Sequence, residues 1–461
     1  MIAHSCRHVP WLLVTAAIGV APIASAQGPV SPDTTALSLL DAIEMALAYH
    51  PAIGAAQASE AAAASRVGEA TAQWWPSVSA AGSLTRFEEP MLVYPLHGFP
   101  AGPLDTSVFR FDRTLLQGNV SLAWTLWDGG ARSARIKSAR ADEAAVTAGG
   151  DAAVMTVIGE VTTAYLSVLS AAATLDAHLL SLRSLTAERD RVRRLLDEGR
   201  VARVALLRVD AAIAQAEADR IGSTSRLEAA EHSLARLLGV APDRTRSSLL
   251  EPIRLVDAPV AENPDALIAQ FEAASPEFAE ASARADAADL ARRVASAAWQ
   301  PKIDLVGAYL AFGSTDADLQ GEWQTGVRLS YPLFTGFARA RAVAGASARA
   351  AAAEEQLRLT QLQGAETIDR TLTAVRESHA RAAAVATAVQ HLEEVARIEQ
   401  LALAEGAGTQ TDFLRADADL RGARASLVQA RHAEILARIQ LARTTGTLSV
   451  DWLAHTLEIL P

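Results

Sequence analysis

The stretch VSLAWTLWDGGARSARIKSARAD, residues 120–142, changes its pattern at a pair of glycines. Up to Trp127, apolar residues alternate with small polar ones, which is typical of a half-buried strand. After Gly129 and Gly130 the chain is rich in Ala, Arg and Lys, which favours a helix. The stretch therefore predicts a strand that runs directly into a long helix.

An internal repeat is the main feature of the sequence. VRLSYPLFTGFARARAVAGASARA, residues 327–350, shows the same change of pattern. Matching positions differ by 225 early in each half (300 minus 75) and by 207 later (331 minus 124). The matches are Trp75 with Gln300, Trp124 with Tyr331, Gly129 with Gly336, Leu207 with Leu414, and LARLLG (234–239) with LARTTG (441–446). Offsets that stay constant over so long a stretch predict two copies of one structural unit.

Each half of the chain reads as helix, strand, strand, very long helix and helix, so the predicted fold is mainly α with a β-barrel part. Ser38 and Asp41 predict a capping pair at the start of the first helix, residues 39–73. The predicted division is a signal peptide (1–26); a first repeat (27–239) with strands at 76–87 and 114–127 and a long helix at 131–197; a linker (240–262); a second repeat (263–447) with strands at 301–312 and 322–335 and a long helix at 337–404; and a C-terminal tail (448–461).

The first residues are typical of a secretory leader. Arg7 precedes an apolar run, and Ala24-Ser25-Ala26 supplies a small-residue cleavage site. The run is shorter than the roughly 20 residues of a membrane-spanning helix, so a retained anchor is the weaker interpretation. The only cysteine, Cys6, lies in this leader, which leaves the mature chain without disulfides. A net charge of −11 without a basic cluster argues against a nucleic-acid partner.

The long helix of the first half carries a heptad stripe in its middle. Val154, Val161 and Val168 recur at one heptad position, and Ile158 and Tyr165 at the other. At 1.5 Å per residue, a helix of about 70 residues is roughly 100 Å long, which is more than one compact domain can cover. The stripe therefore predicts a bundle or tube of helices.

The strands have one apolar and one polar face. On the second strand Val120, Leu122, Trp124 and Leu126 share one face, whereas Ser121 and Thr125 lie on the other. The repeat keeps this alternation, with Gln324 and Arg328 on its polar face. Such strands fit a transmembrane β-barrel, although a soluble hairpin packed on helices would alternate in the same way.

Export favours the barrel interpretation. The longest uncharged apolar run, Val161 to Leu175, is too short to span a membrane as a helix, and a closed barrel is the other permitted solution. Four strands cannot close a barrel, because the smallest membrane barrels have about eight. The sequence therefore predicts that several chains share one barrel, with the polar residues Ser121, Thr125, Gln324 and Arg328 facing its lumen.

Taken together, these motifs resemble the TolC-type outer membrane efflux protein family from Leu37 to about Leu448. The resemblance rests on DAIEMALAYHPAI, on the pair WTLWDGGARSARIKSA and YPLFTGFARARAVAGA, and on the turns EGRVARVALLR and EGAGTQTDFLR. It implies a homotrimer in the outer membrane that extends into the periplasm. Its twelve-stranded β-barrel would continue as a twelve-helix periplasmic α-barrel. The implied partners are a periplasmic adaptor (membrane fusion) protein and an inner-membrane transporter.

The resemblance also implies functional residues. The helix-to-helix turns would be the tips that contact the adaptor: Gly199, Arg200, Val201 and Ala202, and Gly406, Ala407, Gly408 and Thr409. The family typically has two acidic residues, three positions apart, that constrict the periplasmic entrance after the second turn. Asp412 matches the first, but Arg415 stands at the second, and whether Asp417 replaces it stays open. Asp412 and Arg415 could pair within one chain or between chains.

No pattern for catalysis or for a cofactor is present in the sequence. It contains no HExxH motif, no P-loop and no GxGxxG fingerprint, and its carboxylates are spread along helix faces. The expected function is that of a passive exit channel of a tripartite efflux pump. The alternatives are the outer-membrane duct of a type I protein secretion system and a periplasmic coiled-coil protein without a pore. The sequence does not name the cargo or assign a role to the loop 88–113.

Overall fold

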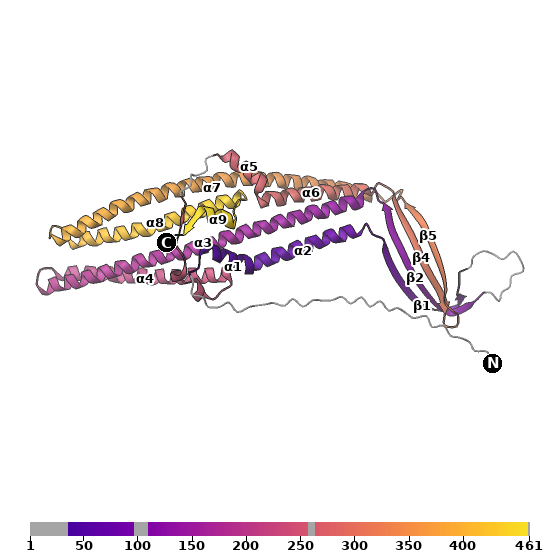
Figure 1. Ribbon diagram of the computed structural model, residues 1–461, viewed down its shortest axis with the longest axis horizontal. Coiled ribbons are helices and arrows are strands. Elements are labelled where there is room, and N and C mark those ends of the chain that lie inside the picture. Colours follow the sequence, from indigo (N-terminus) through magenta and orange to yellow (C-terminus); the bar gives the residue numbers. More distant parts are fainter. Residues whose placement is uncertain (1–35, 96–108, 257–262, 460–461) are drawn as a thin grey trace. The chain divides into compact units, whose positions relative to one another are not determined.

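The computed structural model describes residues 36–95, 109–256 and 263–459, and Figure 1 shows their course. The predicted signal peptide, 1–26, lies outside these residues. The described chain begins with helix α1 (Leu39–Tyr49), and the Ser38 side chain and Asp41 form the expected capping box at its start.

The first helical segment is two helices, not the single helix predicted at 39–73. α1 ends at Tyr49, and α2 spans Pro51–Ala72. His50 between them has an extended backbone, φ −69° and ψ 129°, because the Pro51 ring disfavours the helical conformation in the residue before it. The second half breaks in the same way, between α5 (Pro264–Ala274) and α6 (Pro276–Ala297).

Four antiparallel strands form one sheet in the order β1-β2-β4-β5 (Figure 1). The strands are β1 (Ser77–Leu92), β2 (Phe111–Trp127), β4 (Lys302–Ser314) and β5 (Gln320–Ser330). In the first hairpin Ser77 lies opposite Ala123, and in the second Lys302 lies opposite Ser330. These pairs differ by 225 (302 minus 77) and 207 (330 minus 123), the two offsets of the sequence repeat. The two hairpins therefore have the same register.

Prolines lie near the two strand ends that differ most from the prediction; the starts of β2 and β5 and the end of β4 differ by two or three residues. β1 runs to Leu92, beyond the predicted end at residue 87, and its pairing with β2 shifts register between Arg86 and Met91. Pro90 lies within that shift, where the ladder needs no N–H donor. β5 ends at Ser330 instead of residue 335, because Pro332 cannot donate a ladder hydrogen bond.

Two long helices follow the strands. α3 spans Ala131–Asp197 and α7 spans Ala338–Ala404, and each has 67 residues. Each turns back into a shorter helix, α4 (Arg203–Leu238) and α8 (Gln410–Thr444). Figure 1 shows α4 running beside α3 and α8 beside α7, and α3 also packs against α2, α6 and α8. α3 therefore joins the two halves of the chain.

The hydrophobic core lies in the middle of α3, where the heptad stripe was predicted. Ile158, Val161, Tyr165 and Val168 are buried there against α1, the end of α4, and α8. The Tyr165 hydroxyl donates to the carbonyl oxygens of Leu37 (2.9 Å) and Glu251 (2.8 Å). The same helix has a segment apolar enough to cross a membrane, with mean hydropathy 1.6, whereas the longest uncharged apolar run was predicted to be too short for that. Its contacts in the core account for that character.

The predicted linker 240–262 is folded in its described part. It forms two short 3₁₀ helices, η2 (Pro242–Thr245) and η3 (Ser247–Leu249), and strand β3 (Ile253–Leu255). β3 pairs antiparallel with β6 (Leu457–Ile459), which follows α9 (Val450–Thr456) near the C-terminus. Leu250 and Ile253 are buried in the core, so this segment fastens the two halves of the chain together.

Candidate functional site

The four residues predicted to face a lumen lie on one face of the sheet. Ser121 on β2 is opposite Ala308 on β4, which is opposite Gln324 on β5. Four residues along, Thr125 is opposite Asp304, which is opposite Arg328. Residues directly opposite each other in neighbouring strands project from the same face, as do residues four apart in one strand. The structure thus brings all four side chains to one surface.

Further polar residues extend this face. The Thr125 hydroxyl donates to Asp304 Oδ1 at 2.8 Å, and the Lys302 ammonium lies 3.0 Å from the same oxygen. The hydroxyls of Ser79 on β1 and Ser121 are 2.8 Å apart. Sequence reasoning missed Ser79, Lys302 and Asp304, although the same alternation applied to β1 and β4 would have found them. Together these residues make this face of the sheet largely polar, although Ala308 of β4 separates Ser121 from Gln324.

The opposite face of the sheet is apolar and open to solvent in a single chain. One row across it consists of Val120, Tyr309 and Trp323, and another, four residues along, of Trp124, Leu305 and Val327. Trp323 is 74% exposed and Val327 67% exposed. Large apolar side chains at this exposure, opposite a polar face, are the pattern of strands in lipid.

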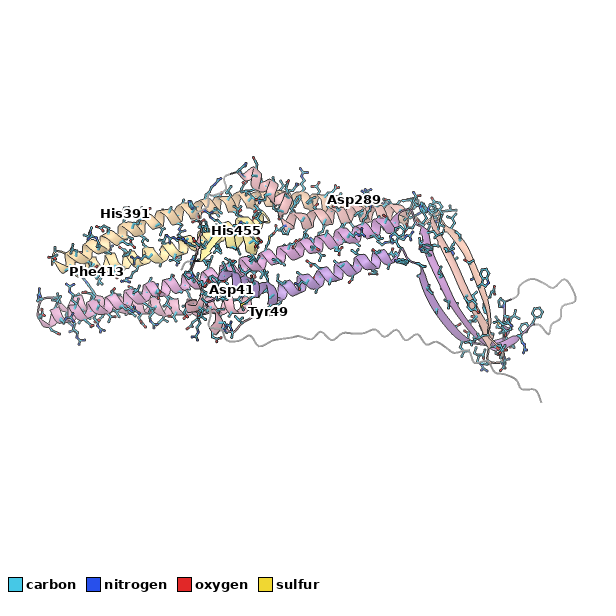
Figure 2. All side chains as sticks on the ribbon, in the orientation of Figure 1. Asp41, Tyr49, Asp289, His391, Phe413 and His455 are labelled. Atoms are coloured by element: carbon cyan, nitrogen blue, oxygen red, sulfur yellow. The ribbon has the colours of Figure 1, made fainter. Side chains whose placement is uncertain are left out.

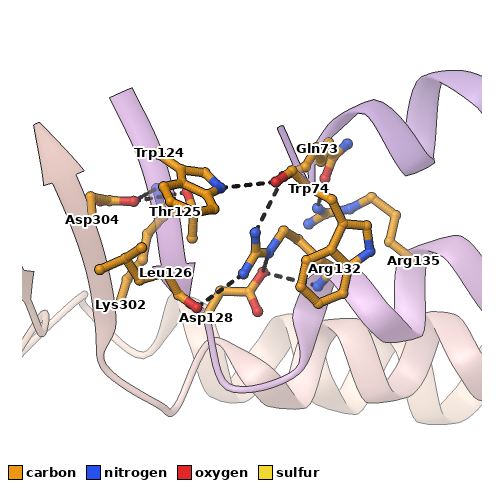
Figure 3. Close-up of polar contacts among 10 residues, drawn as sticks. All are labelled: Gln73, Trp74, Trp124, Thr125, Leu126, Asp128, Arg132, Arg135, Lys302 and Asp304. Atoms are coloured by element: carbon orange, nitrogen blue, oxygen red, sulfur yellow. Dashed lines mark hydrogen bonds and ion pairs between the residues drawn. The ribbon is translucent and has the colours of Figure 1, made fainter. Parts of the chain in front are cut away.

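Arg132 fixes the junction between β2 and α3 (Figure 3). Its side chain is buried, ion-paired with Asp128 at 3.4 Å and stacked on the Trp74 ring at 4.3 Å. The guanidinium also donates to the carbonyl oxygens of Gln73 (3.3 Å) and Leu126 (3.2 Å). One side chain therefore joins the end of α2, the end of β2 and the start of α3.

Arg339 does the same at the second junction. Its guanidinium lies 4.5 Å from the Trp299 ring centre and 5.8 Å from that of Tyr331. It donates to the carbonyl oxygens of Ala298 (3.5 Å) and Leu333 (3.4 Å). Sequence reasoning missed both arginines, although Arg132 and Arg339 are related by the offset of 207 (339 minus 132).

The two junctions and the polar face of the sheet line an open cavity of about 1100 Å³. Its charged lining consists of the basic residues Arg132, Arg135, Lys302, Arg328 and Arg339 and the acidic residues Glu69, Asp128 and Asp304. Thr125, one of the predicted lumen residues, lines it as well. The cavity is therefore the place where the polar sheet face continues onto the helices.

The two helix-to-helix turns, the predicted adaptor-contacting tips, are built alike. After α3, Gly199 has φ 75° and the Arg200 N–H donates to Leu195 O at 2.8 Å; Val201 and Ala202 complete this turn. After α7, Gly406 has φ 74° and the Ala407 N–H donates to Ala402 O at 2.8 Å; Gly408 and Thr409 complete the second turn. Both are glycine-terminated helix ends in which the left-handed residue lets the last carbonyls find donors.

The turns differ at the start of the following helix. Thr409 caps α8, because its hydroxyl oxygen accepts from the Asp412 N–H at 3.2 Å and its hydroxyl donates to the Asp412 carboxylate. Ala202 holds the same position before α4 and has no side chain that could cap. Asp412, predicted to constrict the entrance, is thus also part of a helix cap.

Asp412 and Arg415 are both exposed on α8, which continues past Phe413 (Figure 2). Within the described part of one chain, no ion pair joins them at 4.0 Å or less. Asp417 instead lies against its own helix, with Oδ2 2.7 Å from Arg421 Nε. Arg421 also donates to the Ser184 hydroxyl on α3 at 3.1 Å. Asp417 and Arg421 therefore connect α8 to α3 near the turns.

A buried carboxyl lies one helical turn from this connection. Glu188 on α3 is 6% exposed, and its Oε1 has no hydrogen-bond partner among the described atoms. Burial raises the pKa of Glu188 to about 7, against a smaller lowering by the Arg191 guanidinium. Sequence reasoning did not single out this residue, because burial of one carboxylate among many on a charged helix has no local signal. No group of three or more metal-ligating side chains occurs among the described residues.

The sequence of this chain is similar to those of known outer-membrane proteins. A family model described as outer membrane efflux protein matches residues 42–240 and 267–447. The protein CyaE of Bordetella pertussis is 32% identical over 367 residues, covering 74% of this chain and 70% of the relative. This sequence similarity supports the family match without any comparison of structures.

Solved outer-membrane proteins share the fold. The outer membrane protein VceC of Vibrio cholerae aligns with a TM-score of 0.71 and 22% identity, over 88% of this chain and 96% of that one. The CmeC outer membrane channel of Campylobacter jejuni aligns with a TM-score of 0.74 and 14% identity, over 90% and 88%. The open state of the MtrE channel of Neisseria gonorrhoeae gives 0.68 and 18%, over 91% and 94%.

Proposed function

The chain belongs to the outer membrane efflux protein family, and from this we propose that it is the exit channel of a tripartite efflux pump. Proteins of this family are outer-membrane channels that extend into the periplasm, so the chain is a channel and not an enzyme. In the proposed role it passively conducts small molecules that an inner-membrane transporter and a periplasmic adaptor deliver.

The free edges of the sheet support a channel made of several copies. β1 and β5 each pair with one strand only among the described residues, so each leaves an edge open. Unpaired backbone N–H and C=O groups are too costly to expose to lipid, and closing the sheet on itself removes them. Three copies of four strands give twelve, enough for a closed barrel. A homotrimer is therefore the proposed assembly.

The repeat defines how neighbouring copies would pair. Within one chain β2 pairs with β4, and Val120 lies opposite Tyr309. In the repeat, β2 corresponds to β5 (120 plus 207 is 327) and β4 corresponds to β1 (309 minus 225 is 84). β5 and β1 are the two edge strands of the sheet. The same contact between copies would set Val327 opposite Leu84 of the partner subunit. Both residues lie on the apolar face, as Val120 and Tyr309 do, so the pairing keeps the two faces consistent.

The helices of this trimer would form the periplasmic part. The contact of α3 with α6 inside one chain would recur between α7 and α2 of the next copy, which gives a twelve-helix α-barrel. The proposed division of the chain follows: a cleaved signal peptide (1–26), two repeats (27–239 and 263–447), a joining segment (240–262) and a tail (448–461).

The turns and the residues beside them are the proposed periplasmic entrance. Gly199 to Ala202 and Gly406 to Thr409 would contact the adaptor, because they are the surfaces at which both helix pairs end. Asp412 and Arg415 would line the constriction, where Arg415 would pair with Asp412 of the partner subunit. Asp417 would act indirectly, through the connection of Arg421 to α3.

The observation that carries this proposal is the two-faced sheet with open edges. It argues against the alternative of a soluble coiled-coil protein, whose exposed sheet face would not be built from Trp323 and Val327. Reconstitution in planar bilayers tests it: the purified protein should form discrete conducting channels. A protein that stays monomeric and gives no conductance would contradict the proposal.

A deletion strain distinguishes efflux from type I secretion. If the channel serves efflux, loss of the chain should increase susceptibility to small toxic compounds, and the set of secreted proteins should stay the same. Disappearance of one protein from the medium, with unchanged susceptibility, would favour the secretion duct.

A further inference from the structure

The cavity at the two strand-to-helix junctions has an excess of positive charge. Five basic and three acidic side chains line it, a difference of +2 for each chain (5 minus 3). We define these eight residues as the junction band: Arg132, Arg135, Lys302, Arg328, Arg339, Glu69, Asp128 and Asp304.

Two of the basic residues are neutralised locally. Arg132 is paired with Asp128 at 3.4 Å, and Lys302 with Asp304 at 3.0 Å. The two charges of each pair largely cancel each other's electric field in the cavity, because they are in contact. The excess charge must therefore come from the other members of the band.

Three arginines provide it. Arg135 donates to the Gln73 side-chain oxygen and Arg339 to backbone carbonyl oxygens, which are neutral acceptors. Arg328 is exposed on the polar face of β5. Among the described residues, none of the three lies within 4.0 Å of a carboxylate oxygen. Two carboxylates of the band oppose them: the exposed Glu69, and Asp304, which already contacts Lys302 and lies directly opposite Arg328 in the neighbouring strand.

We propose that the junction band is a selectivity filter for anions, so that the channel favours solutes that carry carboxylate, phosphate or sulfate groups. The inference rests on the proposed trimeric channel, in which three copies of the band would place a charge of about +6 around the passage. Rings of Arg and Lys select anions in other pores, and a cleft lined by one sign of charge concentrates counter-ions. Arg415 at the proposed entrance has the same sign.

Reversal potentials in a KCl gradient across a planar bilayer test this proposal. Chloride should permeate about twofold or more better than potassium at roughly 0.1 M salt. The preference should fall towards one at about 1 M, where the screening length shortens from about 10 Å to about 3 Å. A preference for potassium, or none at low salt, would overturn the inference while leaving the channel intact. Absence of any conductance would overturn the proposed function itself, and the inference with it.

Variants identify the residues responsible. The double variant Arg135→Gln with Arg328→Gln should lose the chloride preference, whereas Arg328→Lys, which keeps the charge, should retain it. Arg86→Gln is the matched control, because Arg86 is exposed on the same sheet but on its apolar face. A double variant that conducts with unchanged selectivity would show that the junction band is not the filter. Equal losses in Arg86→Gln would show the same.

Discussion

Gly130 and Phe337 occupy equivalent places, immediately before the two 67-residue helices, and both have a left-handed backbone, with φ of 85° and 65°. Glycine adopts this conformation freely, whereas it costs an L-residue roughly 1–2 kcal/mol. The Phe337 ring is 73% exposed, and its ring centre lies 5.8 Å from that of Phe334. The second junction therefore contains backbone strain that the first one avoids.

Replacing Phe337 by Gly should relieve this strain. We expect Phe337→Gly to be more stable than Phe337→Ala by about 1 kcal/mol, since both variants lose the ring but only alanine keeps the Cβ atom. Chemical unfolding in detergent compares the two free energies. A glycine variant that is no more stable than the alanine variant would show that the left-handed backbone at this position is not strained.

The first turn of α8 should be more stable than the first turn of α4, because only α8 has a side-chain cap. Thr409→Ala removes the side-chain oxygen that accepts from the Asp412 N–H, which should destabilise the start of α8 by about 1 kcal/mol. Hydrogen exchange of the first amides of α8 should then accelerate, and those of α4 should not change. Exchange that stays the same at both tips would mean that the cap does not hold the helix.

Arg421 should help to keep the entrance closed. Arg421→Ala removes the bond to Ser184 on α3 and both bonds to Asp417, so the closed-state conductance of the reconstituted channel should rise. Arg424→Ala is the control, because Arg424 pairs with Glu393 on α7 and both side chains are largely exposed. Similar conductance of the two variants would remove Arg421 from the gate.

The proposed contact of Arg415 with Asp412 of the partner subunit has its own test. Arg415→Ala should also raise the closed-state conductance, and the charge-conserving Arg415→Lys should raise it less. Conductance that is unchanged in both variants would exclude this contact from the gate.

Glu188 should make the stability of the protein depend on pH. Its pKa is about 7 in the folded chain and 4.5 in the unfolded chain, so the folded state binds the proton more tightly. The stabilisation is complete below pH 4.5 and is lost as pH rises through 7, by at most about 1.4 kcal/mol per pH unit. In Glu188→Gln the free energy of unfolding should therefore depend less on pH between pH 4.5 and 7. An equally steep fall in the variant would assign the pH dependence to other groups.

Periodicity and the repeat predicted the elements that depend on local sequence. The change at Gly129-Gly130 predicted where β2 gives way to α3, and alternation predicted which face Ser121 and Arg328 share. The break at His50 was also readable, because a proline follows it.

Contacts between distant residues were not predicted. β3 pairs with β6 through Arg254 and Glu458, which are far apart in the chain and have no shared motif. The contacts of Arg132 and Arg339 join the end of a helix, the end of a strand and the start of a long helix, and these three segments come together only in the folded chain. The repeat did contain a signal for them, because each arginine and its tryptophan partner, Trp74 or Trp299, recur at the two offsets.

Disulfide cross-linking tests the central claim, that three copies close one barrel by pairing β5 with β1. The only natural cysteine, Cys6, lies in the predicted signal peptide, so introduced thiols would be the only ones in the mature chain. In the combination Val327→Cys with Leu84→Cys, neighbouring copies would bring the two Cβ atoms about 4.5–5.5 Å apart. Val327→Cys with Ser83→Cys is the control, because these side chains lie on opposite faces of the sheet.

The first combination should yield covalent dimers and trimers on non-reducing gels after mild oxidation of membranes, and reduction should return them to monomers. The control should stay monomeric. Only monomers in the first combination, or equal cross-linking in both, would contradict the proposed barrel.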